Sequence, residues 1–161
     1  MLSATSEHAL RALVQLARLP SGTLALGRKL AESADIPPNY LSKILLTLRN
    51  VGIVEATRGH GGGYRLSKLP GEIKLIDVIE LFEGIRSRPG CLLGEKHDCS
   101  DHTPCSAHAM WKEVKQAYLS FLESNSIADI ATLPSPHGSG KDAADGAKRK
   151  LPRHPVRPDE A

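Results

Sequence analysis

The chain has 161 residues, 40% of them hydrophobic, and a formal net charge of +3 at pH 7. This length suffices for one domain with a modest core and attached segments. The sequence contains no apolar run that could span a bilayer and no signal-peptide pattern at its N-terminus, which predicts a cytoplasmic protein without a membrane partner.

The charge is spread unevenly along the chain. Residues 1–70 carry nine Lys or Arg against four Asp or Glu, residues 71–133 six against ten, and residues 134–161 six against four. A basic first part beside an acidic middle predicts that an anionic partner meets residues 1–70 only.

Three helices are expected in the first fifty residues. Residues 3–20 place Leu10, Leu13, Val14 and Ala17 at helical spacing and end at Pro20. Residues 26–34 predict a shorter helix. A turn is expected at 35–38, with Pro38 suited to the first turn of a third helix that continues through Asn50. Two helices joined by a tight turn, with a strand directly after, are the helix-turn-helix layout.

A hairpin is expected to follow these helices. Residues 53–56 and 64–66 have strand character, and four glycines surround His60 between them. A nucleotide-binding loop would place its glycines between a strand and a helix, followed by Lys-Ser or Lys-Thr. Here a second strand follows instead, so the pattern indicates a wing and not a phosphate loop.

The remainder predicts two more helices and a tail. Residues 75–82 form a short helix that ends at Gly84. The longest helix is expected to have Thr103 as its cap and Pro104 at its first position, and to run to about Ser124. Its recurring apolar residues predict that it pairs with the same helix of a second subunit, with packing against its own domain as the alternative. These residues are Met110, Val114, Tyr118, Phe121 and Leu122.

The predicted fold is therefore mainly α with a small β-hairpin wing. Residues 1–84 form a winged helix-turn-helix domain and residues 85–105 a cysteine-rich loop. Residues 106–133 form the dimerisation helix and a terminal turn. Residues 134–161, rich in proline and charge, predict a disordered tail.

All three cysteines lie in the loop before the long helix. Cys91, Cys99 and Cys105 are separated by seven and five residues, and His108 follows three residues after the last of them. In a reducing compartment, clustered cysteines are more often metal ligands or redox switches than disulfides. The loop is thus a candidate metal or cluster site, with free thiols as the alternative.

The sequence resembles a known family, the Rrf2 family of IscR/NsrR/RirA-type winged-helix regulators. The matching stretches are SEHALRALVQLA, PPNYLSKILLTLRNVGIVEATRGHGGGYRLS, IKLIDVIELFEG and CSAHAMW, so the resemblance covers about residues 2–133. Its YLxxxLxxLxxxGxVxxxRGxxGGYxL core is highly specific. The resemblance implies a homodimeric transcription regulator that binds double-stranded operator DNA and carries an iron–sulfur cluster on its loop in cluster-binding members.

The expected DNA contacts lie on the third helix and the wing. A recognition helix reads base edges from near its N-terminus. Similar regulators use the positions of Ser42 and Lys43 for operator contact, and the departure here from IscR's Glu–Gln pair predicts a different operator sequence. The candidate residues are Asn39, Tyr40, Ser42, Lys43, Thr47, Arg49, Arg58 and His60.

The candidate metal ligands are Cys91, Cys99, Cys105 and His108. Cys105 and His108, spaced i, i+3 at the start of a helix, are expected to share one face, and the helix dipole would favour the thiolate of Cys105. In similar IscR-type proteins a histidine at the place of His108 binds a 2Fe–2S cluster, the form favoured here. The seven-residue gap departs from IscR's shorter one, which leaves a 4Fe–4S cluster as the alternative. NsrR-like members instead use a carboxylate from the other subunit, near the place of Glu7.

Two other readings of this site stay open. A Cys3His set also suits a structural zinc ion, and three thiols could form a redox switch without metal. A brown, bleachable protein isolated without oxygen would indicate iron–sulfur, and a colourless metal-bound one zinc. No Ser/His/Asp set, paired carboxylates or nucleotide loop indicates an enzyme or a small-molecule substrate. An electron carrier would have no use for a wing, and a structural adaptor would not bind upstream DNA.

Overall fold

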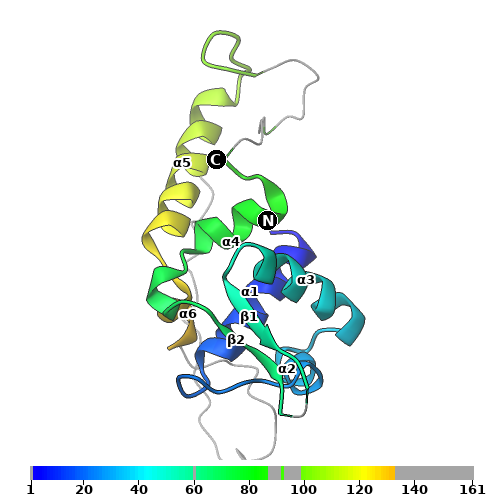
Figure 1. The fold of residues 1–161 in the computed structure, drawn as a ribbon. Helices are drawn as coiled ribbons and strands as arrows, with labels where there is room; N and C mark the ends of the chain where they lie inside the picture. The colour runs from blue at the N-terminus through cyan, green and yellow to red at the C-terminus, as the bar shows by residue number, and fades with distance from the viewer. Residues whose placement is uncertain (1, 60, 87–91, 93–98, 133–161) are drawn as a thin grey trace, which may run out of the picture.

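The computed structural model describes residues 2–59, 61–86, 92 and 99–132. Cys91, His60 and the tail at 134–161 lie outside the described residues. The described part is mostly helical with a two-stranded antiparallel hairpin (Figure 1), as predicted. The elements are α1 (Ala4–Ala17), α2 (Gly27–Ala34), α3 (Pro38–Asn50), β1 (Val54–Thr57), β2 (Gly63–Leu66), η1 (Pro70–Glu72), α4 (Leu75–Glu83), α5 (His108–Ser124) and α6 (Ile127–Ala131).

Helix α1 is the central element of the domain. It packs against α2, α3, α4 and α6, and Ser3 caps its N-terminus by accepting a hydrogen bond from the Ser6 backbone N–H. Its fully buried residues are Ser6, Ala9, Ala12 and Leu13, and Leu16 is 5% exposed. The expected inward set overlaps these residues only at Leu13, because small alanines let four neighbouring helices approach closely.

The helix-turn-helix unit forms as its sequence predicts. Helix α2 ends at Ala34 and is followed by Asp35, which caps it in the left-handed conformation with a φ of 52°. Pro38 is the first residue of α3. The inward residues of α3 are all 2% exposed or less. They are Leu41, Ile44, Leu45 and Leu48.

The wing pairs Val54 with Leu66 and Thr57 with Gly63. Tyr64 exchanges two backbone hydrogen bonds of 2.8 Å with Ala25, which adds a bridge on the outer side of β2. A Cβ atom on Gly63 would lie 2.5 Å from the Ala25 carbonyl oxygen. Glycine is required here by the close approach of two backbones.

The chain returns to the winged domain after α5. Lys74 and Ser126 form a bridge, with backbone bonds from Leu75 to Asn125 and from Ile127 to Ile73. Ile127 is fully buried in the core. The C-terminal end of α5 is thereby fixed to the domain that contains α3.

Helix α5 is the longest described helix, and it extends along one side of the molecule beyond α4 (Figure 1). Only Leu122 of this helix is fully buried, and Tyr118 is partly buried against the core. Met110, Val114 and Phe121 are 68%, 57% and 52% exposed. The expected apolar face is thus divided between the core and solvent.

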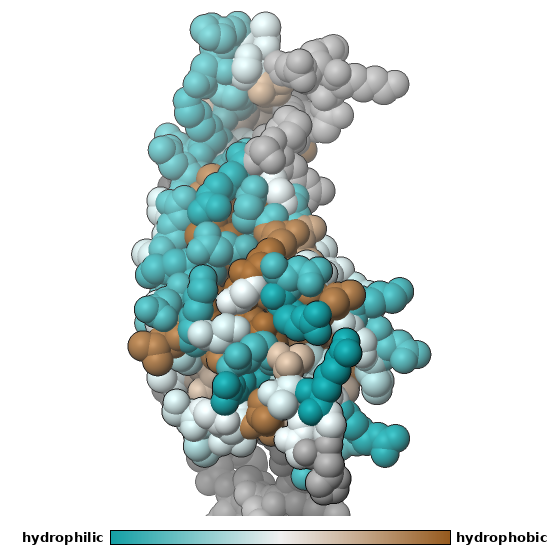
Figure 2. Space-filling view, in the orientation of Figure 1, coloured by the Kyte–Doolittle hydropathy of each residue, from teal (hydrophilic) through white to brown (hydrophobic). Residues whose placement is uncertain are grey.

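The surface reflects the same division. In the space-filling view, hydrophobic side chains gather around α4, whereas hydrophilic side chains cover much of α5 (Figure 2). None of the described helices is long and apolar enough to cross a membrane.

Candidate metal centre and nucleic-acid interface

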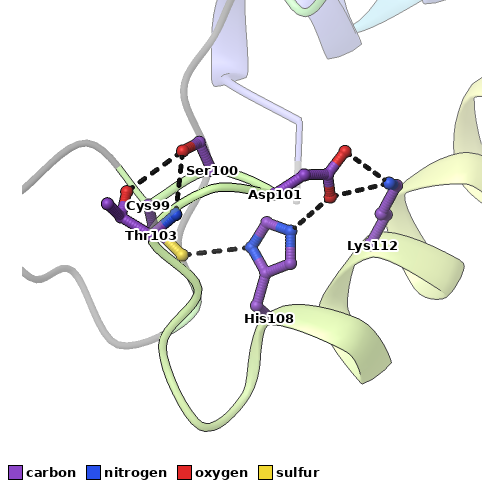
Figure 3. A network of polar contacts seen from close by, with 6 residues as sticks. All are labelled: Cys99, Ser100, Asp101, Thr103, His108 and Lys112. Carbon is purple, nitrogen blue, oxygen red and sulfur yellow. Dashed lines mark hydrogen bonds and ion pairs between the residues drawn. The ribbon is translucent and has the colours of Figure 1, made fainter.

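Four side chains form a continuous polar chain at the start of α5 (Figure 3). Cys99 Sγ lies 3.1 Å from His108 Nδ1, and His108 Nε2 lies 2.9 Å from Asp101 Oδ1. Lys112 Nζ donates to both carboxylate oxygens of Asp101 at 2.7 Å. A thiol, an imidazole, a carboxylate and an ammonium group are thus linked in one line.

The local backbone explains how these groups meet. His108 is the first residue of α5 and Lys112 lies one turn later, so both side chains project from the same side of the helix. Before the helix, Ser100 and Thr103 exchange backbone hydrogen bonds of 3.4 and 3.2 Å, and their hydroxyl oxygens are 3.0 Å apart. This turn brings Cys99 and Asp101 back toward the imidazole.

The electrostatics of the chain favour an ionised Asp101. Its carboxyl pKa is lowered, first by the hydrogen bond from Lys112 and then by the one from His108. The side chain of His108 is 20% exposed, and that of Asp101 is 65% exposed. The imidazole is therefore the sheltered member, and its carboxylate partner faces water.

Helix α5 starts later than predicted, at His108 and not at Pro104. Thr103 does not cap α5, which begins at His108 with Ala107 before it. Thr103 instead donates its backbone N–H to Ser100, and Cys105 precedes the helix. The expected shared helix face of Cys105 and His108 is wrong, because Cys105 lies before the first residue of α5. His108 meets Cys99 instead.

The donor set can be compared with metal geometry. Two ligands of one tetrahedral metal, a thiolate and an imidazole, lie about 3.5 Å apart, given the usual bond lengths. Cys99 Sγ and His108 Nδ1 are 3.1 Å apart, so the two atoms would need to move only slightly apart to bind one metal ion. Among residues 2–59, 61–86, 92 and 99–132, no group of three or more His, Cys, Asp or Glu is arranged to hold one. The fit therefore rests on this pair of soft donors.

The other predicted ligands are Cys91, Cys105 and Glu7. Cys91 lies outside the described residues. Cys105 is partly buried, and its carbonyl accepts the His108 backbone N–H at 3.0 Å. Glu7 lies in the first turn of α1 and is exposed. Its contact with a second subunit stays a prediction.

The outer face of α3 carries most of the predicted DNA contacts. Asn39, Ser42, Lys43 and Arg49 are exposed, and Arg58 is exposed directly after β1. The hydroxyl of Ser42 donates to the Pro38 carbonyl at 2.9 Å. That bond occupies its hydrogen and leaves oxygen lone pairs that can accept.

Thr47 and Tyr40 are less free to reach DNA. Thr47 is partly exposed and its hydroxyl donates to the Lys43 carbonyl at 3.1 Å. Tyr40 is partly buried, with its hydroxyl hydrogen-bonded to Thr5 and its ring edge-on to His8 at 5.3 Å between centroids. Tyr40 therefore joins α3 to α1.

Sequence reasoning missed Asp101 and Lys112. The i, i+4 spacing of His108 and Lys112 was a signal for Lys112, although only after the start of α5 is known. Asp101 offered no local signal because its approach depends on the turn between Ser100 and Thr103.

Comparisons with known proteins agree on one family. The family model described as "Rrf2: Iron-dependent Transcriptional regulator" matches residues 2–132. The HTH-type transcriptional regulator NsrR of Bacillus licheniformis is 33% identical over 125 residues, which are 78% of this chain and 87% of that protein.

Solved structures show the same fold. CymR, titled the global cysteine regulator of B. subtilis, is similar with a TM-score of 0.68 and 25% identity, over 82% of this chain and 96% of that one. IscR of T. potens is similar with a TM-score of 0.63 and 25% identity, over 85% and 94%.

Proposed function

We propose, on the premise that this chain belongs to the Rrf2 family of DNA-binding transcription regulators, that an iron–sulfur cluster on the loop before α5 controls its operator affinity. The observation that carries this proposal is the convergence of Cys99 Sγ and His108 Nδ1 at 3.1 Å. In some 2Fe–2S clusters, histidine replaces cysteine as the ligand of one iron, so that both thiolates and imidazoles hold the cluster.

The proposed ligands are Cys91, Cys99, Cys105 and His108, with a 2Fe–2S cluster favoured. When bound, the cluster would supply a centre sensitive to iron, nitric oxide or redox state. A carboxylate from Glu7 of a second subunit is the alternative fourth ligand.

The chain offers a mechanical link from this site to DNA. His108 begins α5, and the other end of that helix is held in the core by Leu122. The chain then bonds to the start of α4 through the Asn125 carbonyl and the Leu75 N–H at 3.1 Å. A change in the position of His108 would therefore move α5, whose other end is attached to the winged domain.

Pairing of two subunits would convert that movement into operator spacing. Members of the family typically act as dimers, and α5 presents exposed Met110, Val114, Ala117 and Phe121 at spacings of four, three and four residues. This is the repeat of a helix-pairing seam. We infer that two α5 helices pair along it, which would place two recognition helices on one face of DNA.

The operator contacts proposed for this dimer are the exposed residues of α3 together with Arg58 and His60 of the wing. Lys43, Arg49 and Arg58 supply positive charge for phosphates. Asn39 and Ser42, near the start of α3, are in the positions from which a recognition helix reaches base edges. Thr47 and Tyr40 would contribute at the border of the interface.

A second candidate is a thiol switch or a structural zinc site at the same residues. The Cys99–His108 pair suits zinc as well as iron. The similar structure of CymR, a global cysteine regulator, supports a signal of sulfur chemistry.

Anaerobic isolation followed by absorption spectroscopy and iron, sulfide and zinc quantitation separates these candidates. Iron and sulfide in near-equal amounts with visible absorption support the cluster. Zinc alone supports the structural site, and a metal-free protein whose operator affinity changes on oxidation supports the thiol switch.

A further inference from the structure

We propose that Asp101, held by Lys112, determines which nitrogen of His108 can bind the metal, and that this nitrogen is Nδ1. The inference deepens the proposed function, because it concerns the histidine proposed there as a ligand. Asp101 and Lys112 are positioning residues: they act on the imidazole and contact no metal themselves.

The hydrogen-bonding capacity of the groups fixes the arrangement. An ionised carboxylate can only accept hydrogen bonds, so the 2.9 Å contact between Asp101 Oδ1 and His108 Nε2 requires the hydrogen on Nε2. In a neutral imidazole the other nitrogen then carries the lone pair. That nitrogen, Nδ1, faces Cys99 Sγ at 3.1 Å. The nitrogen of His108 that is free to bind a metal is therefore the one that contacts the sulfur of Cys99.

Lys112 restricts where the carboxylate can lie. Its ammonium group contacts both carboxylate oxygens of Asp101 at 2.7 Å. One of these oxygens, Oδ1, also accepts the hydrogen bond from His108 Nε2. Lys112 and His108 are one helical turn apart, so the two donors are held in register by α5. A single exposed ion pair contributes little to stability. The arrangement is better explained by orientation of the imidazole than by stability of the fold.

A metal-binding histidine characteristically donates a hydrogen bond to a carboxylate from the ring nitrogen that does not bind the metal. A carboxylate on the outer nitrogen fixes the tautomer and makes the inner nitrogen a better electron donor, and its loss typically weakens metal binding 10- to 100-fold. The side-chain exposures of 65% for Asp101 and 54% for Lys112 mean that both can be changed without opening the core.

The first test reads the tautomer in metal-free, full-length protein by 15N NMR of the imidazole above neutral pH. In the wild type we expect the hydrogen on Nε2 of His108. In Asp101→Asn we expect a mixture of tautomers, because the amide of asparagine can donate as well as accept. Asp101→Glu should restore the Nε2–H form, and Glu113→Gln, which removes an exposed charge from the same helix, should leave it unchanged.

The second test measures cluster retention and midpoint potential after reconstitution with iron and sulfide. Asp101→Asn should lose its cluster roughly 10- to 100-fold faster than the wild type. Its potential should rise, because a neutral partner makes the imidazole a poorer donor. Lys112→Gln should have a smaller effect, and none when added to Asp101→Asn, because Lys112 acts through Asp101.

The outcomes separate this inference from the proposed function. A wild type that takes up no iron and sulfide defeats the cluster, and the NMR result alone then decides the role of Asp101. A hydrogen on Nδ1 in the wild type, or a tautomer unchanged in Asp101→Asn, overturns the inference. So does a loaded Asp101→Asn protein with wild-type retention and potential.

Discussion

The winged domain and the region around His108 differ in what holds them together. In the winged domain, α1 to α4 and α6 surround a core of aliphatic side chains, many of them less than 5% exposed. Around His108 the contacts are polar and half-exposed, and the first half of α5 buries no residue fully. The winged domain thus has an extensive aliphatic core, whereas the region around His108 is held by a few polar contacts that face water.

The largest effect should come from opening the core of the winged domain. Leu45 is 1% exposed, and Leu45→Ala should lower the free energy of unfolding by about 2–5 kcal/mol. The next residue, Leu46, is 52% exposed, and Leu46→Ala should change the free energy of unfolding by no more than about 0.5 kcal/mol. Urea unfolding of both variants measures the contrast, and equal losses would contradict the assigned core.

Crowding the wing should have the next largest effect. In Gly63→Ala the new methyl group would lie 2.5 Å from the Ala25 carbonyl oxygen, which should cost about 1–3 kcal/mol of stability and weaken operator binding. A Cβ on Gly71 would meet nothing within 4 Å, so Gly71→Ala is the matched control. Thermal unfolding and gel shift would show whether the bridge between Ala25 and Tyr64 holds the wing.

A smaller effect is expected when one phosphate contact is removed. Arg58→Ala should weaken binding to DNA from upstream of the protein's own gene and reduce the slope of log affinity against log salt by about 0.9. Lys115→Gln removes the same charge from α5 and should leave the slope unchanged. Titrations at several salt concentrations decide it, and an unchanged slope for Arg58→Ala would remove this residue from the interface.

The smallest effect concerns the cap of α6. Hydrogen bonds from the Ser126 hydroxyl and backbone lower the pKa of Asp129. A lowered folded-state pKa stabilises the fold above the unfolded pKa, and this contribution is lost as the pH falls through the folded one. Asp129→Asn should therefore unfold at a lower temperature than the wild type at pH 7, and the difference should shrink in acid. Glu123→Gln serves as control, and a difference that stays constant with pH would contradict this role of Asp129.

The winged domain was predictable because its signals are local. Pro38 marks the start of α3, Gly84 ends α4, and the glycines between the two strands mark a hairpin. The inward face of α1 was less accurate. Alanines at positions 9 and 12 carry little hydrophobic signal, and their burial depends on four neighbouring helices.

The candidate site was predictable in its residues and not in their pairing. Thr103 and Pro104 resemble a helix start, and the structure uses Thr103 for a turn with Ser100 instead. That turn brings Cys99 to His108 across nine residues, and places Asp101 on the outer nitrogen. Such contacts arise from the path of the loop, which spacing alone does not determine.

One measurement tests the central claim most directly: the operator affinity of the full-length protein, loaded with its cluster and stripped of it, at the same salt concentration and without oxygen. We expect the two affinities to differ at one or more operators, and DNA to change reciprocally the rate at which the cluster is lost. Equal affinities for a protein shown to contain iron and sulfide would contradict it.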